Sequence, residues 1–189
     1  MEALAGLARL FDAGAALLLR RPDQALLEAA AAILPCHAAP MLEADALPLA
    51  LEDWSDLFFS PRSGRYLPPL ESVFREGRLG GEAAQEAARA YAGAGFEPAR
   101  LDMDPLWRAI PHADHLGFEL AFVSALLRCA AEDSAGGAAL LATARTFHAA
   151  RVAPWVGAYG HKLADAARSP LYRAAGALLA KLAAPLAAC

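Results

Sequence analysis

Residues 112–119 hold the densest set of side chains that could bind a metal or transfer a proton. His112, His115 and Glu119 are spaced by three and four positions, so within a helix they would share one face. Two imidazoles and a carboxylate can ligate zinc, but the chain contains no His-Glu-x-x-His or Glu-x-x-His sequence. We therefore expect no metal. In the alternative interpretation Asp114 caps the following helix or bonds backbone amides near its start, and Glu119 is a buried, hydrogen-bonded carboxylate.

The other reactive side chains form no catalytic motif. The serines show no Gly-x-Ser-x-Gly turn, and the cysteines lie in no local catalytic signature. The glycines of residues 77–81 are not followed by Lys-Ser or Lys-Thr, as a phosphate-binding loop requires. We expect no catalytic residue, no cofactor and no enzymatic activity.

Trp54, Leu57 and Phe58 are spaced so that they share one helical face. Such a face is most often part of a core, and it is also the pattern of a peptide-binding wall. The wall interpretation is favoured by the loop of residues 60–69, which follows directly, because pockets form where loops meet rigid elements.

The elements that would position these residues are all helical. Long stretches of Ala, Leu, Glu and Arg and the absence of alternating patterns predict an all-α fold. The most apolar long segment, residues 114–131, is apolar on two sides and should be central. We predict one domain over residues 1–189, a bundle of roughly eight to ten helices. Besides the central helix, we expect helices at about 2–19, 22–34, 44–58, 82–94, from 105, 138–151, 154–167 and 170–186.

Charge and cysteine content restrict the partners and the compartment. The net charge is −4 and the basic residues are scattered, so nucleic acid is not expected as a partner. Cys36, Cys129 and Cys189 are far apart, as expected of lone thiols in a reducing cytoplasm. Charged residues interrupt the apolar N-terminal segment, so we expect neither a signal peptide nor stable membrane insertion.

Several sequence blocks together resemble the TorD/DmsD-type maturation chaperones, to which the NarJ-type proteins are related. The blocks follow the order of that family, and the most specific is the signature Asp-His-Leu-x-x-Glu-Leu-x-Phe. They are Asp53-Trp54-Ser55-Asp56-Leu57-Phe58, Pro69-Leu70-Glu71-Ser72-Val73-Phe74, Gly77-Arg78-Leu79-Gly80-Gly81, Tyr91 with Gly95-Phe96, residues 114–122, and Phe147, Pro154-Trp155 and Leu171-Tyr172.

The resemblance implies a TorD-like helical fold and a chaperone function. The expected partners are the catalytic subunit of a molybdopterin-dependent oxidoreductase in its apo form and the twin-arginine leader of that subunit. By position, the leader-binding residues would be Trp54, Leu57, Phe58, Pro69, Asp114 and His115. The structural signature residues would be Glu71, Ser72, Glu119, Phe122, Trp155 and Tyr172. Pro111 and His112 depart from the usual order before the Asp-His pair, and no role is transferred to Arg151.

The chemistry of a twin-arginine leader suits this assignment. Its apolar segment would pack on the apolar wall, and carboxylates such as Asp53, Asp56 or Asp114 would attract its basic segment. Three large apolar contacts stabilise a complex by about 5–9 kcal/mol before the costs of association, which predicts micromolar affinity. We also expect Asp114 to favour protonation of His115, making binding sensitive to pH.

Two other functions stay open. An assembly subunit would recognise the folded oxidoreductase and ignore the leader, and a nucleotide-binding regulatory enzyme would hydrolyse a nucleotide. Binding to the isolated leader distinguishes the chaperone from the assembly subunit. The sequence is compatible with a monomer or a dimer.

Overall fold

The computed structural model describes residues 2–133 and 135–186, and in these ranges the regular structure is helical, with no β-strand. The α-helices described are α1 (Glu2–Leu19), α2 (Gln24–Ile33), α3 (Ala38–Met41), α4 (Ala46–Phe58), α5 (Glu82–Gly93), α6 (Pro105–Ala109), α7 (Leu116–Glu132), α8 (Gly137–Phe147), α9 (Ala153–Ala166) and α10 (Pro170–Lys181). Short 3₁₀ turns, η1 (Pro35–His37) and η3 (Pro98–Arg100), and π-helical turns, η2 (Ser72–Glu76) and η4 (His148–Val152), connect some of them. The all-α prediction is confirmed.

The predicted helix starts at Pro105 and Pro170 are confirmed. Asp104 accepts a hydrogen bond from the Leu106 amide, and Ser169 accepts one from the Tyr172 amide, in each case just before a proline at the first helical position. Asp23 is also an N-cap, so α2 begins at Gln24 and not at Pro22. The short elements α3, η1 and η2 were not predicted, because they are too short to show a helical period.

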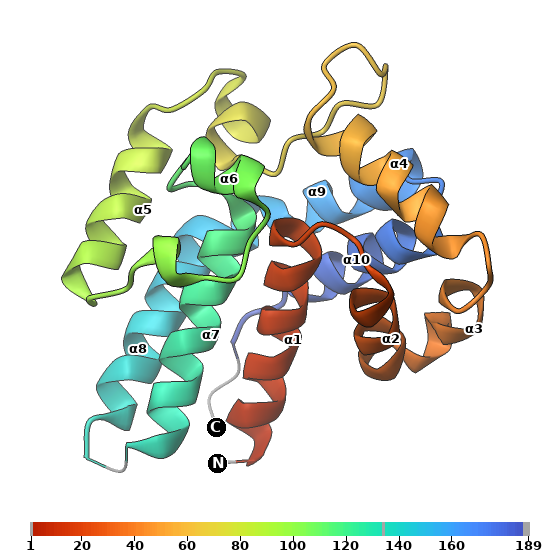
Figure 1. Cartoon of the computed structure of the whole chain (residues 1–189). Helices are drawn as coiled ribbons and strands as arrows, with labels where there is room; N and C mark the ends of the chain where they lie inside the picture. Colours follow the sequence, from red (N-terminus) through yellow and green to blue (C-terminus); the bar gives the residue numbers. More distant parts are fainter. Residues whose placement is uncertain (1, 134, 187–189) are drawn as a thin grey trace.

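Helix α7 is central, as predicted. Every residue from Leu116 to Ser124 is buried, so the first half of the helix is covered on all sides. Figure 1 shows α1 lying alongside α7. The close approach has a local cause, because a Cβ on Gly14 would lie 3.0 Å from the Leu120 side chain. The Ser124 hydroxyl also donates to the Ala8 carbonyl at 2.9 Å.

Helices α8 and α9 lie where two helices were predicted, at about 138–151 and 154–167. The π-helical turn η4 joins them without a break. Pro154 follows at the start of α9 and has no amide hydrogen, so the usual bond to the carbonyl four residues earlier cannot form. The wider turn accommodates this loss, and such π-turns are frequent at functional sites.

Helices α9 and α10 cross at a pair of glycines. A Cβ on Gly160 would lie 2.6 Å from the Gly176 carbonyl oxygen, and a Cβ on Gly176 would be similarly obstructed by Gly160. Only glycine permits this backbone contact, which brings Trp155, Tyr159 and Tyr172 into the core.

Two further sequence predictions concern the surface. Cys36 and Cys129 are free and exposed, whereas Cys189 and Ser134 lie outside the described residues. Of the helices that the structure describes, none is long and apolar enough to span a bilayer.

Candidate functional site

The segment before η2 is hydrogen-bonded to the segment at the start of α7. The Leu116 amide donates to the Pro69 carbonyl at 2.8 Å, and the Glu71 amide donates to the Asp114 carbonyl at 3.0 Å. The Asp114 carboxylate accepts a bond from the Ser72 amide at 2.9 Å. Two parts of the sequence resemblance, residues 69–74 and 114–122, are thereby joined in space.

His115, and not Asp114, is the N-cap of α7. Its Nδ1 atom accepts a hydrogen bond from the Gly117 amide at 3.0 Å. Since α7 begins at Leu116, His112 and His115 precede the helix and do not share a helical face with Glu119. Within the described residues no group of three or more His, Cys, Asp or Glu side chains could hold a metal ion.

The expectation of a protonated His115 is wrong. The side chain is 1% exposed, and its burial, together with the nearby His112, lowers its pKa to about 3. The Asp114 carboxylate that was to favour protonation is directed at the Ser72 amide. His115 is therefore neutral at physiological pH and cannot make binding sensitive to pH near 7.

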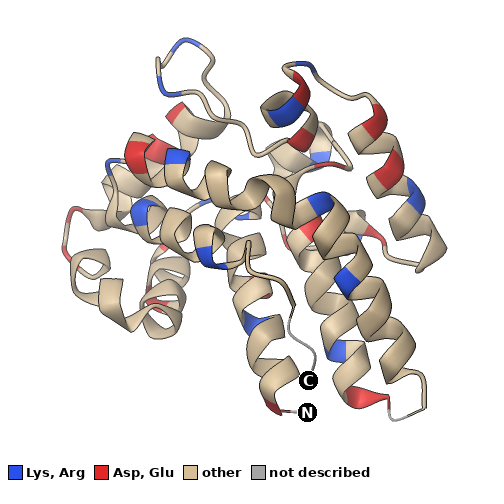
Figure 2. Cartoon of the chain, turned by 180° about the vertical axis from the view of Figure 1, so that it is seen from behind, with Lys and Arg blue, Asp and Glu red and all other residues tan. Residues whose placement is uncertain are grey.

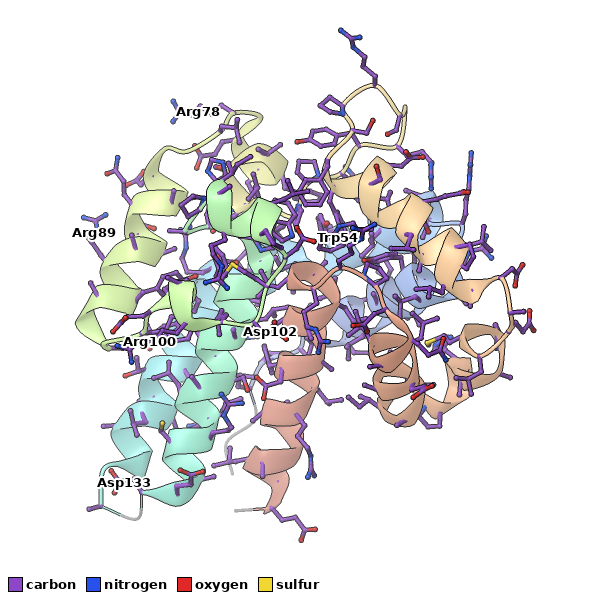
Figure 3. All side chains as sticks on the ribbon, in the orientation of Figure 1. Trp54, Arg78, Arg89, Arg100, Asp102 and Asp133 are labelled. Carbon is purple, nitrogen blue, oxygen red and sulfur yellow. The ribbon has the colours of Figure 1, made fainter. Side chains whose placement is uncertain are left out.

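The six residues predicted to bind the leader are all buried in this structure. Trp54 is 4% exposed, and Leu57, Phe58, Pro69, Asp114 and His115 are also beneath the surface. Figure 3 shows Trp54 among side chains in the middle of the molecule, whereas Arg78 and Arg89 point outward. In this conformation the six residues present almost no surface to a peptide.

Trp107 on α6 covers the predicted wall. Its ring lies 4.3 Å from the His115 ring, 6.3 Å from Trp54 and 6.5 Å from Phe58, measured between ring centroids. Trp107 Nε1 and His115 Nε2 are buried, and no described residue gives either atom a hydrogen-bond partner. Unsatisfied buried groups of this kind each cost about 1–3 kcal/mol, which lowers the stability of the covered arrangement.

The carboxylates expected to attract a basic segment are already bonded within the protein. Arg65 donates to both Asp53 and Asp56, the latter at 2.7 Å. Asp53 also accepts bonds from the Arg168 and Ser169 amides at 2.9 and 2.7 Å. These bonds fix the loop after α4 and the start of α10, and a leader's cation would compete with Arg65 for both carboxylates.

The two π-helical turns meet at a buried charged cluster. Arg151 of η4 donates to Glu71, directly before η2, and to Glu86 of α5, the second bond being 2.7 Å long. Arg75 of η2 binds the other oxygen of Glu71. The cluster therefore links η2, α5 and η4 through one buried carboxylate.

Glu119 lies next to this cluster without a charge partner of its own. The side chain is fully buried, and no described donor reaches its carboxyl oxygens. Burial, followed by the charge of Glu71 and a hydrogen bond with it, raises the pKa of Glu119 well above its usual range. Burial and the charge of Glu71 therefore favour the protonated form of Glu119.

Two open hollows meet at the ion pair between Glu86 and Arg151. One is a groove of about 700 Å³ between α5 and the α7–α8 pair, and it is mainly apolar. The other is a polar pocket of about 340 Å³ at the start of α5. Glu86 and Arg151 line both, so the two hollows adjoin at this ion pair, and together they are called the two-part groove. The polar part is lined by Glu71, Arg75, Glu76, Glu82, Ala83, Glu86 and Arg151.

Residues 8–159 match the family model described as nitrate reductase delta subunit. This match covers most of the chain, including the junction at His115, the charged cluster and both parts of the groove. The chain belongs to the nitrate reductase delta subunit family. It is a family of redox-enzyme maturation chaperones, related to the TorD type, and it acts with catalytic subunits of nitrate reductase-type molybdoenzymes. No curated protein and no solved structure matches the chain.

The delta-subunit match confirms the resemblance seen in the sequence at the level of the family. The signature residues Glu71, Ser72, Glu119, Phe122, Trp155 and Tyr172 are all buried. Trp155 donates from its indole nitrogen to the Arg151 carbonyl at 2.7 Å, and the Tyr172 ring packs on Phe58 at 5.3 Å. These contacts suit a structural role, which stays a prediction, as does the leader-binding role of the other six.

Sequence reasoning missed Trp107, Arg151 and the acidic side of α5. Of these three, only the acidic side of α5 is indicated by a pattern in the local sequence. Glu82 and Glu86 are four positions apart and begin a stripe that continues with Ala90 and Gly93, so one face of the predicted helix changes from acidic to small and apolar. Trp107 and Arg151 are single residues whose partners lie far away in the sequence.

Proposed function

We propose that this protein is a cytoplasmic chaperone that binds the twin-arginine leader and the apo form of a molybdopterin oxidoreductase. It supports insertion of the cofactor and keeps the client from export until loading is complete. Membership of the delta-subunit family over residues 8–159 is the observation that carries the proposal. The ordered sequence blocks and the net charge of −4 support it, since an acidic chaperone suits a basic leader.

Direct contact between the leader and the six predicted residues requires α6 to move, because Trp107 covers them. The helix is only five residues long, and three hydrogen bonds tie it to neighbouring segments. Arg108 donates to the Ala99 and Leu101 carbonyls, and the Asp104 amide donates to the Leu19 carbonyl. In this version of the proposal the apolar segment of the leader takes the place of Trp107.

Calorimetric titration with leader peptides tests the proposal. The peptides are the twin-arginine leaders encoded in the same genome, and the expected result is saturable binding with a micromolar dissociation constant. The matched control is each leader with its arginine pair changed to a glutamine pair, which we expect to bind more weakly.

A titration with the apo catalytic subunit, with and without its leader, distinguishes the proposed chaperone from an assembly subunit. A chaperone of the proposed kind binds the full-length client more tightly than the leaderless form. Equal binding of both forms, with none to the isolated leader, would replace the proposal with an assembly subunit that recognises the body of the oxidoreductase.

A further inference from the structure

The apolar part of the two-part groove stays open because its rims carry small residues. The α5 rim consists of Ala90, Gly93 and Ala94, and the α8 rim includes Ala142 and Thr143. Phe122 and Leu126 of α7, together with Phe147 and Leu140 of α8, form the floor. The rings of Tyr91, Phe122 and Phe147 pack together beneath α5 and keep it apart from α8. The packing of these side chains therefore holds the groove open, and the floor of the groove is apolar.

The polar part of the groove is acidic. Its lining contains four carboxylates and two guanidinium groups, and Arg78 beside it pairs with Glu76, so these seven groups together leave one negative charge in excess. Both arginines of the lining are already bonded to Glu71. Glu82 is exposed and forms no ion pair within the described ranges. Figure 2 shows red bands on η2 and on the first half of α5, beside the mostly tan α7 and α8. A cationic group bound at Glu82 gains a charge partner without displacing an existing one.

One stripe of α5 runs along both parts. Glu82 and Glu86 face the acidic part, and Ala90 and Gly93 follow on the same side over the apolar part. The change from acidic to apolar lining therefore occurs along a single helix axis. A partner lying parallel to α5 meets the two environments one after the other.

We propose that the two-part groove is the binding site of the leader, with the arginine pair at the acidic part beside Glu82 and the apolar segment along Phe122, Leu126 and Phe147. This inference rests on the proposed function and adds the location. A twin-arginine leader has its basic residues directly before an apolar segment of about 7–15 residues. The lining from Leu140 on α8 to Ala150 on η4 is about 15 Å long, which matches about ten residues of a helical peptide. The site needs no movement of α6.

Two substitutions test the two parts separately, using a fluorescent synthetic leader with an arginine pair before an apolar segment of about ten residues. Glu82→Lys reverses an exposed charge in the acidic part, and we expect about five- to tenfold weaker binding. Thr143→Trp fills the apolar part from α8, and we expect a loss of at least about tenfold. Both residues are exposed, so neither variant should impair folding, which circular dichroism and thermal melting would verify.

Matched controls are Glu28→Lys on α2 and Ala139→Trp on α8, because both positions are exposed and neither lines the groove. They should bind like the wild type. A leader with a glutamate pair in place of the arginine pair should bind Glu82→Lys better than it binds the wild type, since the charges are then reversed on both sides.

The outcomes separate this inference from the proposed function. Leader binding by the wild type that is equally strong in Glu82→Lys and Thr143→Trp would overturn the groove as the site and leave the chaperone function intact. Absence of leader binding by the wild type would overturn both the leader-binding function and the groove inference.

Discussion

The buried carboxyl group of Glu119 has a consequence that a titration of stability can detect. Its pKa is raised in the folded protein, chiefly by burial and then by Glu71. The folded state therefore retains a proton that the unfolded chain loses above its ordinary carboxyl pKa of about 4.3. Folding stability contributed by this proton is present at low pH and is lost as the pH rises towards the folded pKa.

Substitution Glu119→Gln removes this dependence, because glutamine resembles the protonated acid and does not ionise. We expect the variant to gain stability relative to the wild type between pH 5 and pH 8, by up to about 1.4 kcal/mol per pH unit. Urea denaturation of both proteins at several pH values measures the difference. A difference that stays constant across this range would show that Glu119 is ionised in the folded state.

For His115 we expect folding stability to depend on pH in the opposite direction. Burial lowers its pKa to about 3, so the unfolded chain takes up a proton below about pH 6.5 and the folded protein does not. The stability due to neutral His115 is complete above that pH and is lost as the pH falls. His115→Asn keeps a side chain that can cap α7. We expect the wild type to lose stability relative to this variant from pH 6.5 to pH 5, by up to about 1.4 kcal/mol per pH unit. Parallel curves would contradict a neutral, buried His115.

At the scale of single residues, the sequence indicated which side chains belong to the core or to the candidate site, but not which groups they contact. Burial of Glu119 followed from its position on a helix that is apolar on two sides. The state of His115 depended on Trp107 and on the bond from the Ser72 amide to Asp114, and neither contact has a local signature. The prediction used the neighbouring carboxylate and omitted desolvation, which is the larger effect here.

At the scale of helices, the α9–α10 crossing depends on two glycines. Gly176→Ala would place a Cβ 2.4 Å from the Gly160 carbonyl oxygen, so the helices must separate. We expect a loss of about 1–3 kcal/mol of folding free energy, the usual cost of overpacking a core. Gly93→Ala is the control, because nothing lies within 4 Å of its Cβ position. Chemical denaturation compares the two, and equal stabilities would contradict the close crossing.

Helix α6 offers a second test at this scale. If the leader contacts the wall of Trp54, Leu57 and Phe58, Trp107→Ala should strengthen leader binding, because the peptide no longer has to displace the indole. If the leader lies in the groove beside α5, the same substitution should leave affinity nearly unchanged while it lowers stability by about 3–5 kcal/mol. Titration and denaturation of this one variant measure both quantities, and weaker binding would contradict both placements.

Most helices could be predicted because their ends are marked locally. Asp104-Pro105 and Ser169-Pro170 are cap and proline pairs, and both open helices where expected. The π-helical turn η4 that joins α8 to α9 could not be predicted, because Pro154 ordinarily signals a new helix and only packing determines that the chain continues through a π-turn. The same turn places Arg151 in the charged cluster, so this part of the site was missed together with the turn.

At the scale of the whole molecule, an acidic protein should hold a basic leader more weakly as salt is added. The excess charge of the polar pocket is exposed, and its attraction is screened over about 8 Å at physiological ionic strength. The apolar part of the groove keeps its contribution under the same conditions. The chaperone would therefore combine a screened electrostatic attraction with a salt-resistant apolar contact, which suits a client that must be held and later released.

The most direct test of the chaperone function is the molybdenum content of the client. The nitrate reductase-type catalytic subunit encoded in the same genome is purified from cells that contain or lack this protein, and molybdenum is measured per subunit. We expect the content to fall strongly without the protein and to be restored when its gene is supplied again. A catalytic subunit that is fully loaded in its absence would contradict a maturation function.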